Sequence, residues 1–309
     1  MTVNSPARPI SYSRRLKRLW LSWLWLVHLS RSARRSAKSQ DISHTAKLMQ
    51  QVSQQLLDAL NVRVELHGKI PEDLNGLLVV ANHTSWLDIL AMASVHPMQF
   101  IAKQEIKSWP VLGKIVVAMG TLFINRAQRK DTAKINAMIT EELHHGGTVA
   151  FFPEARTSDG KGLRAFKGAL FQAAIDSNSA VLPIALRYFN ADGKRSSHAA
   201  FTDEVSLPKS FLTILSEEET VVRVDFTEVL RPEIRTEDTS RFTLKQQAQQ
   251  QVASLVLDSS IHTFSSCRPT SSTLPTSLMR CNSASVSASK RRTSTGVVLD
   301  ARTRPQPLA

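Results

Sequence analysis

Short apolar runs alternate with helical periodicity along the central part of the chain. Residues 77–81 (LLVVA), 148–152 (TVAFF) and 180–186 (AVLPIAL) are almost wholly apolar, as expected of strands buried on both faces of a sheet. Between them, apolar residues recur at helical spacing, as they do over residues 130–145. Strands alternating with helices predict an α/β fold, with a layered, mostly parallel sheet flanked by helices.

The same patterns give expected bounds for each element. The expected strands are residues 62–67, 77–81, 99–103, 121–125, 148–152, 180–186 and 221–230, and the last of these alternates like an outer strand. The expected helices are residues 41–60, 86–94, 108–120, 130–145, 165–176 and 240–258.

Composition narrows the class of protein. Hydrophobic residues make up 42% of the 309 residues and charged residues 21%, which excludes collagen-like, fully disordered and multi-span membrane proteins. The two cysteines, Cys267 and Cys281, both lie in a polar tail. A disulfide framework or a cysteine-rich zinc site is therefore not expected. The low cysteine content instead indicates a reducing compartment.

The positive charge is concentrated at the two ends of the chain. The formal net charge is +13, of which residues 1–40 contribute +9 and residues 268–309 contribute +6, so residues 41–267 carry −2. A nearly neutral folded part does not indicate a nucleic-acid partner.

The amino-terminal segment, residues 1–40, combines tryptophan with basic clusters. Residues 20–29 (WLSWLWLVHL) hold three of the five tryptophans and lie between RRLKR at 14–18 and RSARRSAK at 31–38. Ten helical residues span roughly 15 Å, about half the hydrocarbon core of a bilayer. We expect a segment bound at the membrane interface; a helix docked on the core and a signal segment remain alternatives.

The carboxyl-terminal segment changes composition. Nineteen of residues 259–309 are Ser or Thr, with Pro and Arg among the rest, and such a segment is expected to be disordered. The folded domain is therefore expected to span residues 41–258.

The clearest chemical feature follows the strand at 77–81. His83 comes just past the strand end and Asp88 lies five residues later, in the first turn of the next expected helix. A carboxylate folded back onto one imidazole nitrogen would make the other nitrogen a general base. The alternative is that Thr84 or Ser85 caps the helix and Asp88 only interacts with its dipole.

Two other expected strands end in polar groups, and a third contains a proline. Arg126 follows the strand at 121–125, Glu154 follows the strand at 148–152, and Pro183 lies within the strand at 180–186. Several strand ends that each deliver one group are typical of a site built around one pocket.

These residues fall in four ordered blocks over roughly residues 60–230. The blocks are NHxxxxD at 82–88, GxxFIxR at 120–126, FPE at 152–154 and VxP at 181–183. In them the chain resembles the glycerolipid acyltransferases of the PlsC-like, lysophosphatidic acid acyltransferase type. The resemblance implies the glycerolipid acyltransferase fold.

The resemblance also implies roles for residues. His83 is the general base and Asp88 orients it, while the hydroxyl of a lysophospholipid attacks the thioester of acyl-CoA or acyl-carrier protein. Arg126 holds the acceptor phosphate and Glu154 takes part in acceptor binding, and the block residues Asn82 and Phe123 are placed with the substrate-binding residues. No metal, cofactor or acyl-enzyme is expected.

The third block departs from the family pattern. Where the family reads FPEGTR, residues 152–157 read FPEART, so Ala155 replaces Gly and the arginine is displaced to Arg156. Ala155 costs little unless the position needs positive φ. Arg156 reaches the phosphate by another route or leaves that contact to Lys161, Arg164 or Lys167.

The sequence therefore predicts acyl transfer to 1-acylglycerol 3-phosphate in phospholipid biosynthesis, at the cytoplasmic face of the inner membrane. One alternative is a lyso-aminolipid acceptor of the ornithine lipid type. Another is a non-catalytic protein that binds a membrane or nucleic acid through its basic ends. His144 and His145 are expected at a helix end rather than in a metal site.

Overall fold

The structure is a computed structural model that describes residues 10–39, 42–108, 113, 117, 120–124, 129–231, 239–258 and 278–280. Its strands are β1 (Val62–Gly68), β2 (Leu78–Ala81), β3 (Gln99–Lys103), β4 (Leu122–Ile124), β5 (Val149–Phe151), β6 (Val181–Asn190), β7 (Thr220–Phe226) and β8 (Leu278–Arg280). Its α-helices are α1 (Tyr12–Ser39), α2 (Ile42–Leu60), α3 (Leu87–Val95), α5 (Arg129–His144), α6 (Gln172–Asp176), α7 (Leu207–Ser216) and α8 (Arg241–Val256). Short 3₁₀ turns cover Gln104–Ser108 and Ala169–Phe171.

The described strands form one mixed sheet in the order β4-β3-β5-β2-β6-β7-β1-β8. Strands β4, β3, β5, β2 and β6 run parallel to one another, and β7 pairs with β6 in the antiparallel sense. The prediction of an α/β fold with a mostly parallel sheet is confirmed. Because β2 and β5 are direct neighbours, the segments that follow them meet at the same edge of the sheet.

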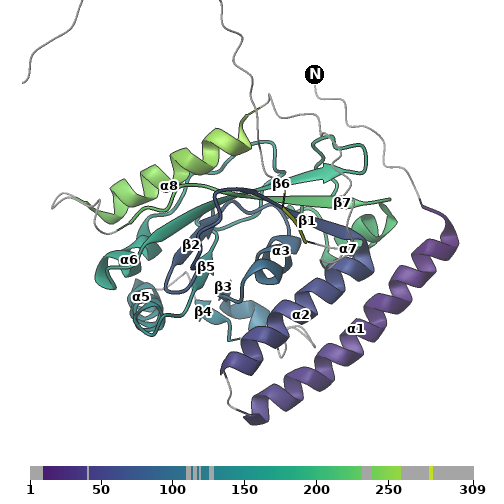
Figure 1. Ribbon diagram of the computed structural model, residues 1–309, viewed down its shortest axis with the longest axis horizontal. Coiled ribbons are helices and arrows are strands. Elements are labelled where there is room, and N and C mark those ends of the chain that lie inside the picture. The colour runs from purple at the N-terminus through teal and green to yellow at the C-terminus, as the bar shows by residue number, and fades with distance from the viewer. Residues whose placement is uncertain are drawn as a thin grey trace, which may run out of the picture.

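Helices cover both faces of the sheet, and each face has its own hydrophobic core (Figure 1). On one face α2 and α3 bury Leu57, Leu87 and Met92 against the strands. On the other face α5 and α8 bury Ile139 and Val252. Each such side chain stabilises the fold by about 1.5–3 kcal/mol.

Strand β7 corrects one expectation, because it is not an outer strand. It lies between β6 and β1, and all seven of its residues are buried. Val222, Val224 and Phe226 face the core that includes α2 and α3. The charged residues between them produced the alternation, and one of them, Asp225, accepts two hydrogen bonds from the buried Arg187 of β6.

Two helical expectations also change. The segment expected to be a helix at 165–176 forms only a 3₁₀ turn and the five residues of α6. The backbone N–H groups at its start bond to other segments instead of within a helix: Lys167 N donates to Pro153 O, and Phe166 N donates to Gln249 Oε1. Helix α7 was not predicted at all. The helix expected at 108–120 lies mostly outside the described residues.

Helix α1 docks along α2 with one face and exposes the other (Figure 1). Trp25 packs with Leu29 and Val52, and its indole Nε1 donates to Val52 O over 2.7 Å. On the outward side Trp20 and Trp23 are each 59% exposed. Within the described chain, no helix has the combined length and apolarity needed to cross a bilayer.

The carboxyl-terminal segment is described only at residues 278–280, where β8 pairs with β1 in parallel. The prediction of disorder for residues 259–309 otherwise lies outside the described residues.

Candidate active site

The turn between β2 and α3 brings His83 and Asp88 together. His83 Nδ1 donates to Asp88 Oδ2 over 2.8 Å. The Asp88 side chain is fully buried, whereas the His83 side chain is 19% exposed. Since Nδ1 is engaged by the carboxylate, Nε2 is the nitrogen available to a substrate, and an imidazole held in this way can take a proton from an alcohol.

The Asp88 carboxylate is fixed by the same turn that carries the histidine. Its Oδ2 also accepts hydrogen bonds from the backbone N–H groups of Thr84 and Ser85, over 2.7 and 2.9 Å. Asp88 lies in the first turn of α3, where the helix dipole favours a negative charge. Ser85 Oγ accepts only a long hydrogen bond, from Leu87 N over 3.4 Å, so Asp88 makes the shorter contacts with the amides of the turn and is not merely a charge near the helix dipole.

A phenylalanine of the third block sets the plane of the imidazole. The rings of His83 and Phe152 are stacked, with centroids 3.9 Å apart and planes 9° apart. Because β2 and β5 are adjacent, Phe152 immediately after β5 lies beside His83 after β2. The stacking leaves the imidazole little freedom to rotate away from Asp88.

The side chain of Glu154 supports His83 by binding the backbone N–H of His83. Oε1 accepts from His83 N over 2.7 Å, and Oε2 accepts from Arg164 N over 2.9 Å. The residue is only 4% exposed. Burial raises the pKa of the Glu154 carboxyl, and the two backbone hydrogen bonds oppose that rise.

The turn after Glu154 needs the conformation that glycine normally supplies. Ala155 has φ +65°, in the left-handed region, and its N–H donates to Phe152 O over 3.1 Å. This is the position at which the family pattern has glycine. Ala155 therefore carries backbone strain that glycine would not.

Arg156 leaves this turn toward solvent. Its Nη1 lies 3.2 Å from Asp203 Oδ2, and its side chain is 65% exposed. Lys167, predicted with it as a substrate contact, is also exposed, although its backbone N–H bonds Pro153 O beside the site.

Two other predicted residues, Asn82 and Phe123, have side chains engaged away from the imidazole. The amide of Asn82 bonds both backbone groups of Leu186, so this 1% exposed residue joins β2 to β6 instead of facing a ligand. Phe123 lies on β4, which β3 and β5 separate from β2, and the Lys107 ammonium is 5.9 Å from its ring. Arg126 lies outside the described residues.

Two loops hold the turn that carries His83 from the other side. Ser158 N donates to His83 O, and Phe201 N donates to Thr84 O, each over 2.8 Å. Gly160 lies against Thr84, where an added Cβ would meet the Thr84 methyl group at 3.2 Å. The segments after β5 and after β6 therefore both rest on the turn that carries His83.

Sequence reasoning missed Tyr188, whose hydroxyl donates to Asp88 Oδ1. Tyr188 lies in β6 and is 3% exposed. The signal available in the sequence was weak: Tyr188 is one of only two tyrosines and lies in an apolar strand.

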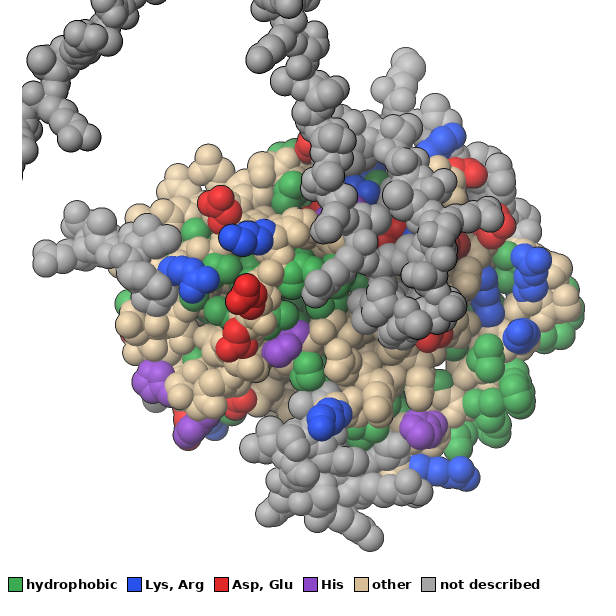
Figure 2. Space-filling view, viewed as in Figure 1, with side chains coloured by type: hydrophobic (Ala, Val, Ile, Leu, Met, Phe, Trp, Pro, Cys, Tyr) green, Lys and Arg blue, Asp and Glu red, His purple; other side chains and the backbone are tan. Residues whose placement is uncertain are grey.

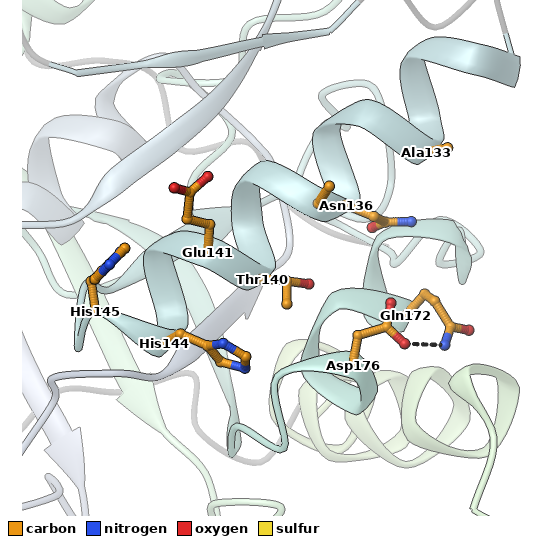
Figure 3. Close-up of a pocket in the computed structure, with 9 residues that line it drawn as sticks. Ala133, Asn136, Thr140, Glu141, His144, His145, Gln172 and Asp176 are labelled. Atoms are coloured by element: carbon orange, nitrogen blue, oxygen red, sulfur yellow. Dashed lines mark hydrogen bonds between the residues drawn. The ribbon is translucent and has the colours of Figure 1, made fainter.

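A hollow of about 630 Å³ lies elsewhere, between α5 and α6 (Figure 3). Glu141, His144 and His145 line it, and the two histidines lie at the end of α5, next to the start of β5 and so at the opposite edge of the sheet from His83. Among the described residues, no three His, Cys, Asp or Glu side chains gather closely enough to hold a metal ion.

Comparisons with known proteins agree with this geometry. A family model described as Acyltransferase matches residues 61–187. A 1-acyl-sn-glycerol-3-phosphate acyltransferase from Neisseria meningitidis is 43% identical over 248 residues, which are 80% of this chain and 95% of the relative. A lyso-ornithine lipid O-acyltransferase from Pseudomonas aeruginosa is 35% identical over 197 residues, which are 64% of this chain and 73% of the relative.

A solved structure shares the fold. It is the crystal structure of the 1-acyl-sn-glycerophosphate (LPA) acyltransferase PlsC from Thermotoga maritima, with a TM-score of 0.59 and 20% identity over 79% of this chain and 93% of that one. Together with the sequence relatives and the ordered blocks, this likeness establishes that the chain belongs to the PlsC-like acyltransferase family.

Proposed function

We propose that this protein transfers a fatty acyl chain from acyl-CoA or acyl-carrier protein to the free hydroxyl of 1-acylglycerol 3-phosphate. The observation that carries the proposal is the 2.8 Å contact between His83 Nδ1 and a fully buried Asp88, with the imidazole part-exposed. The relative from N. meningitidis, which is named for this acceptor, is matched over 95% of its length.

In the proposed reaction, His83 Nε2 takes the proton of the acceptor hydroxyl as the hydroxyl oxygen attacks the thioester carbonyl carbon. The C–S bond then breaks, the acyl group stays on the acceptor oxygen, and His83 returns the proton to the leaving thiolate. Asp88 stabilises the imidazolium that exists between these steps. No group of the protein becomes acylated.

The acceptor phosphate requires cations near the site. We assign this role to Arg126, from the second block, together with Lys161, Arg164 and Lys167, whose exposed side chains follow Glu154 along the chain. Glu154 contributes indirectly, because both of its oxygens are bonded to backbone N–H groups.

Acyl transfer by purified protein tests the proposal. With acyl-CoA and 1-acylglycerol 3-phosphate, wild type should form diacylglycerol 3-phosphate, and His83→Ala should lose roughly 10²–10⁴-fold in kcat. His145→Ala is the matched control, since this exposed histidine lies at the opposite edge of the sheet. Turnover by His83→Ala at the wild-type rate would overturn the assignment.

A second acceptor is favoured by one observation. Arg156 is exposed and paired with Asp203, and Thr157 stands where the family pattern has its arginine. A lyso-ornithine lipid, which has no phosphate, would not need that arginine, and the P. aeruginosa relative with this activity in its name is 35% identical. A panel of the two acceptors with mass-spectrometric product identification decides between them.

We further propose that the exposed face of α1 holds the enzyme on the cytoplasmic face of the membrane, where thioester donors are available. Leu16, Trp20 and Trp23 are exposed at helical spacing, and Figure 2 shows hydrophobic side chains along the outer edge over α1. Arg14 and Lys17, exposed on the same helix, suit anionic lipids.

Vesicle flotation tests this surface. Trp20→Ser combined with Trp23→Ser should weaken binding to anionic vesicles, whereas Phe242→Ser, which removes a 60% exposed aromatic residue from α8, should not. Equal binding by all three proteins would contradict the assignment.

A further inference from the structure

Tyr188 is the one residue from outside the β2–α3 turn whose side chain bonds the Asp88 carboxylate among the described hydrogen bonds. Its hydroxyl donates to Oδ1, the oxygen that does not contact His83. The other oxygen, Oδ2, already accepts from His83 Nδ1 and from two backbone N–H groups. Tyr188 therefore completes the set of donors around this carboxylate.

Both partners are removed from water, so the contact is not replaceable by solvent. Asp88 is 0% exposed and Tyr188 is 3% exposed. A buried carboxylate oxygen without a donor is strongly unfavourable. Burial and the neighbouring Asp88 charge raise the pKa of Tyr188 well above its ordinary value, so the phenol keeps its proton and remains a donor.

The strand register explains why the hydroxyl reaches this oxygen. Ala81 of β2 pairs with Ile184 of β6, and the amide of Asn82 then bonds both the N–H and the C=O of Leu186, over 2.7 and 2.9 Å. Side chains two residues apart share a face of a strand, so Tyr188 follows Leu186 on the face that carries α3. The Asn82–Leu186 contact thus fixes the position of Tyr188 along the strand direction, beside Asp88.

We propose that Tyr188 is a positioning residue for the acyl-transfer reaction, holding Asp88 so that Oδ2 stays aligned with His83 while the imidazole gains and loses its proton. The inference rests on the proposed function, because it requires His83 to act as the base. A carboxylate anchored through both oxygens does not reorganise when the imidazolium forms, and this preorganisation is the source of the catalytic gain. Asn82 belongs to the same arrangement because it sets the register of β6.

The hydrogen bond also sets how much negative charge Asp88 presents to His83. Within the part of the chain that the structure describes, the ionisable groups that face this pair are Tyr188 from β6 and Glu154 from the segment after β5. Removing the phenol proton donor leaves more charge on the carboxylate, which stabilises the imidazolium form of the pair. A stronger donor has the opposite effect.

Tyr188→Phe is the first test. We expect kcat to fall about 10–100-fold with KM for both substrates within about three-fold, and the acid limb of the kcat/KM profile to move up by about 0.5–1 pH unit. Thr148→Val is the matched control, because it removes a buried hydroxyl that donates to Leu74 O at the other edge of the sheet. It should unfold more easily and leave kcat and the pH profile unchanged.

Fluorinated tyrosine tests the same point without removing the side chain. The chain has two tyrosines, Tyr12 and Tyr188, so 3-fluorotyrosine incorporated into a Tyr12→Phe background labels Tyr188 alone. The more acidic phenol is a stronger donor, and the acid limb should move to lower pH. Opposite displacements in the two experiments are not expected of a residue that only stabilises the fold.

The outcomes separate this inference from the proposed function. If His83→Ala is inactive but both Tyr188 changes leave kcat and the pH profile as in wild type, the positioning role is wrong and the general base stands. If His83→Ala turns over normally, the general base itself is wrong. A Tyr188→Phe protein that loses activity only in proportion to its unfolded fraction would also overturn the positioning role.

Discussion

Ala155 stores strain at the turn that follows Glu154. Its φ of +65° lies in a region that costs a residue with a Cβ roughly 1–2 kcal/mol. We predict that Ala155→Gly raises the free energy of unfolding by about 0.5–1 kcal/mol, since the gain in the folded state is partly offset by greater freedom in the unfolded chain. Urea unfolding followed by circular dichroism measures the change.

The control for Ala155→Gly is the same substitution where the backbone is helical. Ala133 is exposed in α5, and Ala133→Gly should lower the free energy of unfolding by about 1 kcal/mol. If both variants lose stability equally, the turn at Ala155 is unstrained.

His198 makes the loop between β6 and α7 sensitive to acid. Its Nε2 bonds Thr220 Oγ1 at the start of β7, and burial lowers its pKa from 6.5 to about 4. The unfolded chain takes up this proton near pH 6.5 and the folded protein only near pH 4, so lowering the pH through that window costs stability. We predict a loss of roughly 2–3 kcal/mol, measured by urea unfolding at several pH values.

His198→Gln provides the comparison for the acid effect. It keeps a polar side chain in the loop and removes the titrating group, so its stability should depend less on pH between 4 and 6.5. The same slope in the variant and in wild type would assign the effect to other groups.

At the level of elements, the sequence predicted where helices and strands lie along the chain better than it predicted where each lies in the fold. Helix α5 and strand β2 were expected within a few residues because their apolar patterns are strong. Strand β7 was expected at the right residues but on the outside of the sheet. Alternating charges indicate an outer strand unless they are paired inside the protein. Local spacing allowed the His83–Asp88 contact as one of two interpretations, and the ordered blocks favoured it. Tyr188 could not be predicted, because its role depends on a strand register that the sequence does not display.

At the scale of the whole molecule, the buried pair of Arg187 and Asp225 joins β6, β7 and α8. The guanidinium donates to both carboxylate oxygens over 2.7 and 2.9 Å, and its Nη1 also reaches Leu255 O near the end of α8. The two residues are 2% and 5% exposed. Removing one partner leaves the other as a buried charge, which typically costs about 3–5 kcal/mol.

We therefore predict that Asp225→Leu alone and Arg187→Met alone each lower the free energy of unfolding by about 3–5 kcal/mol, whereas the double variant loses much less than the sum. A double-mutant cycle measured by urea unfolding gives the coupling energy. Strict additivity would mean that the two side chains do not interact in the folded protein. Since the pair lies on the face of the sheet opposite α3, the double variant should also retain the His83–Asp88 contact and hence acyl transfer, which the same preparations can measure.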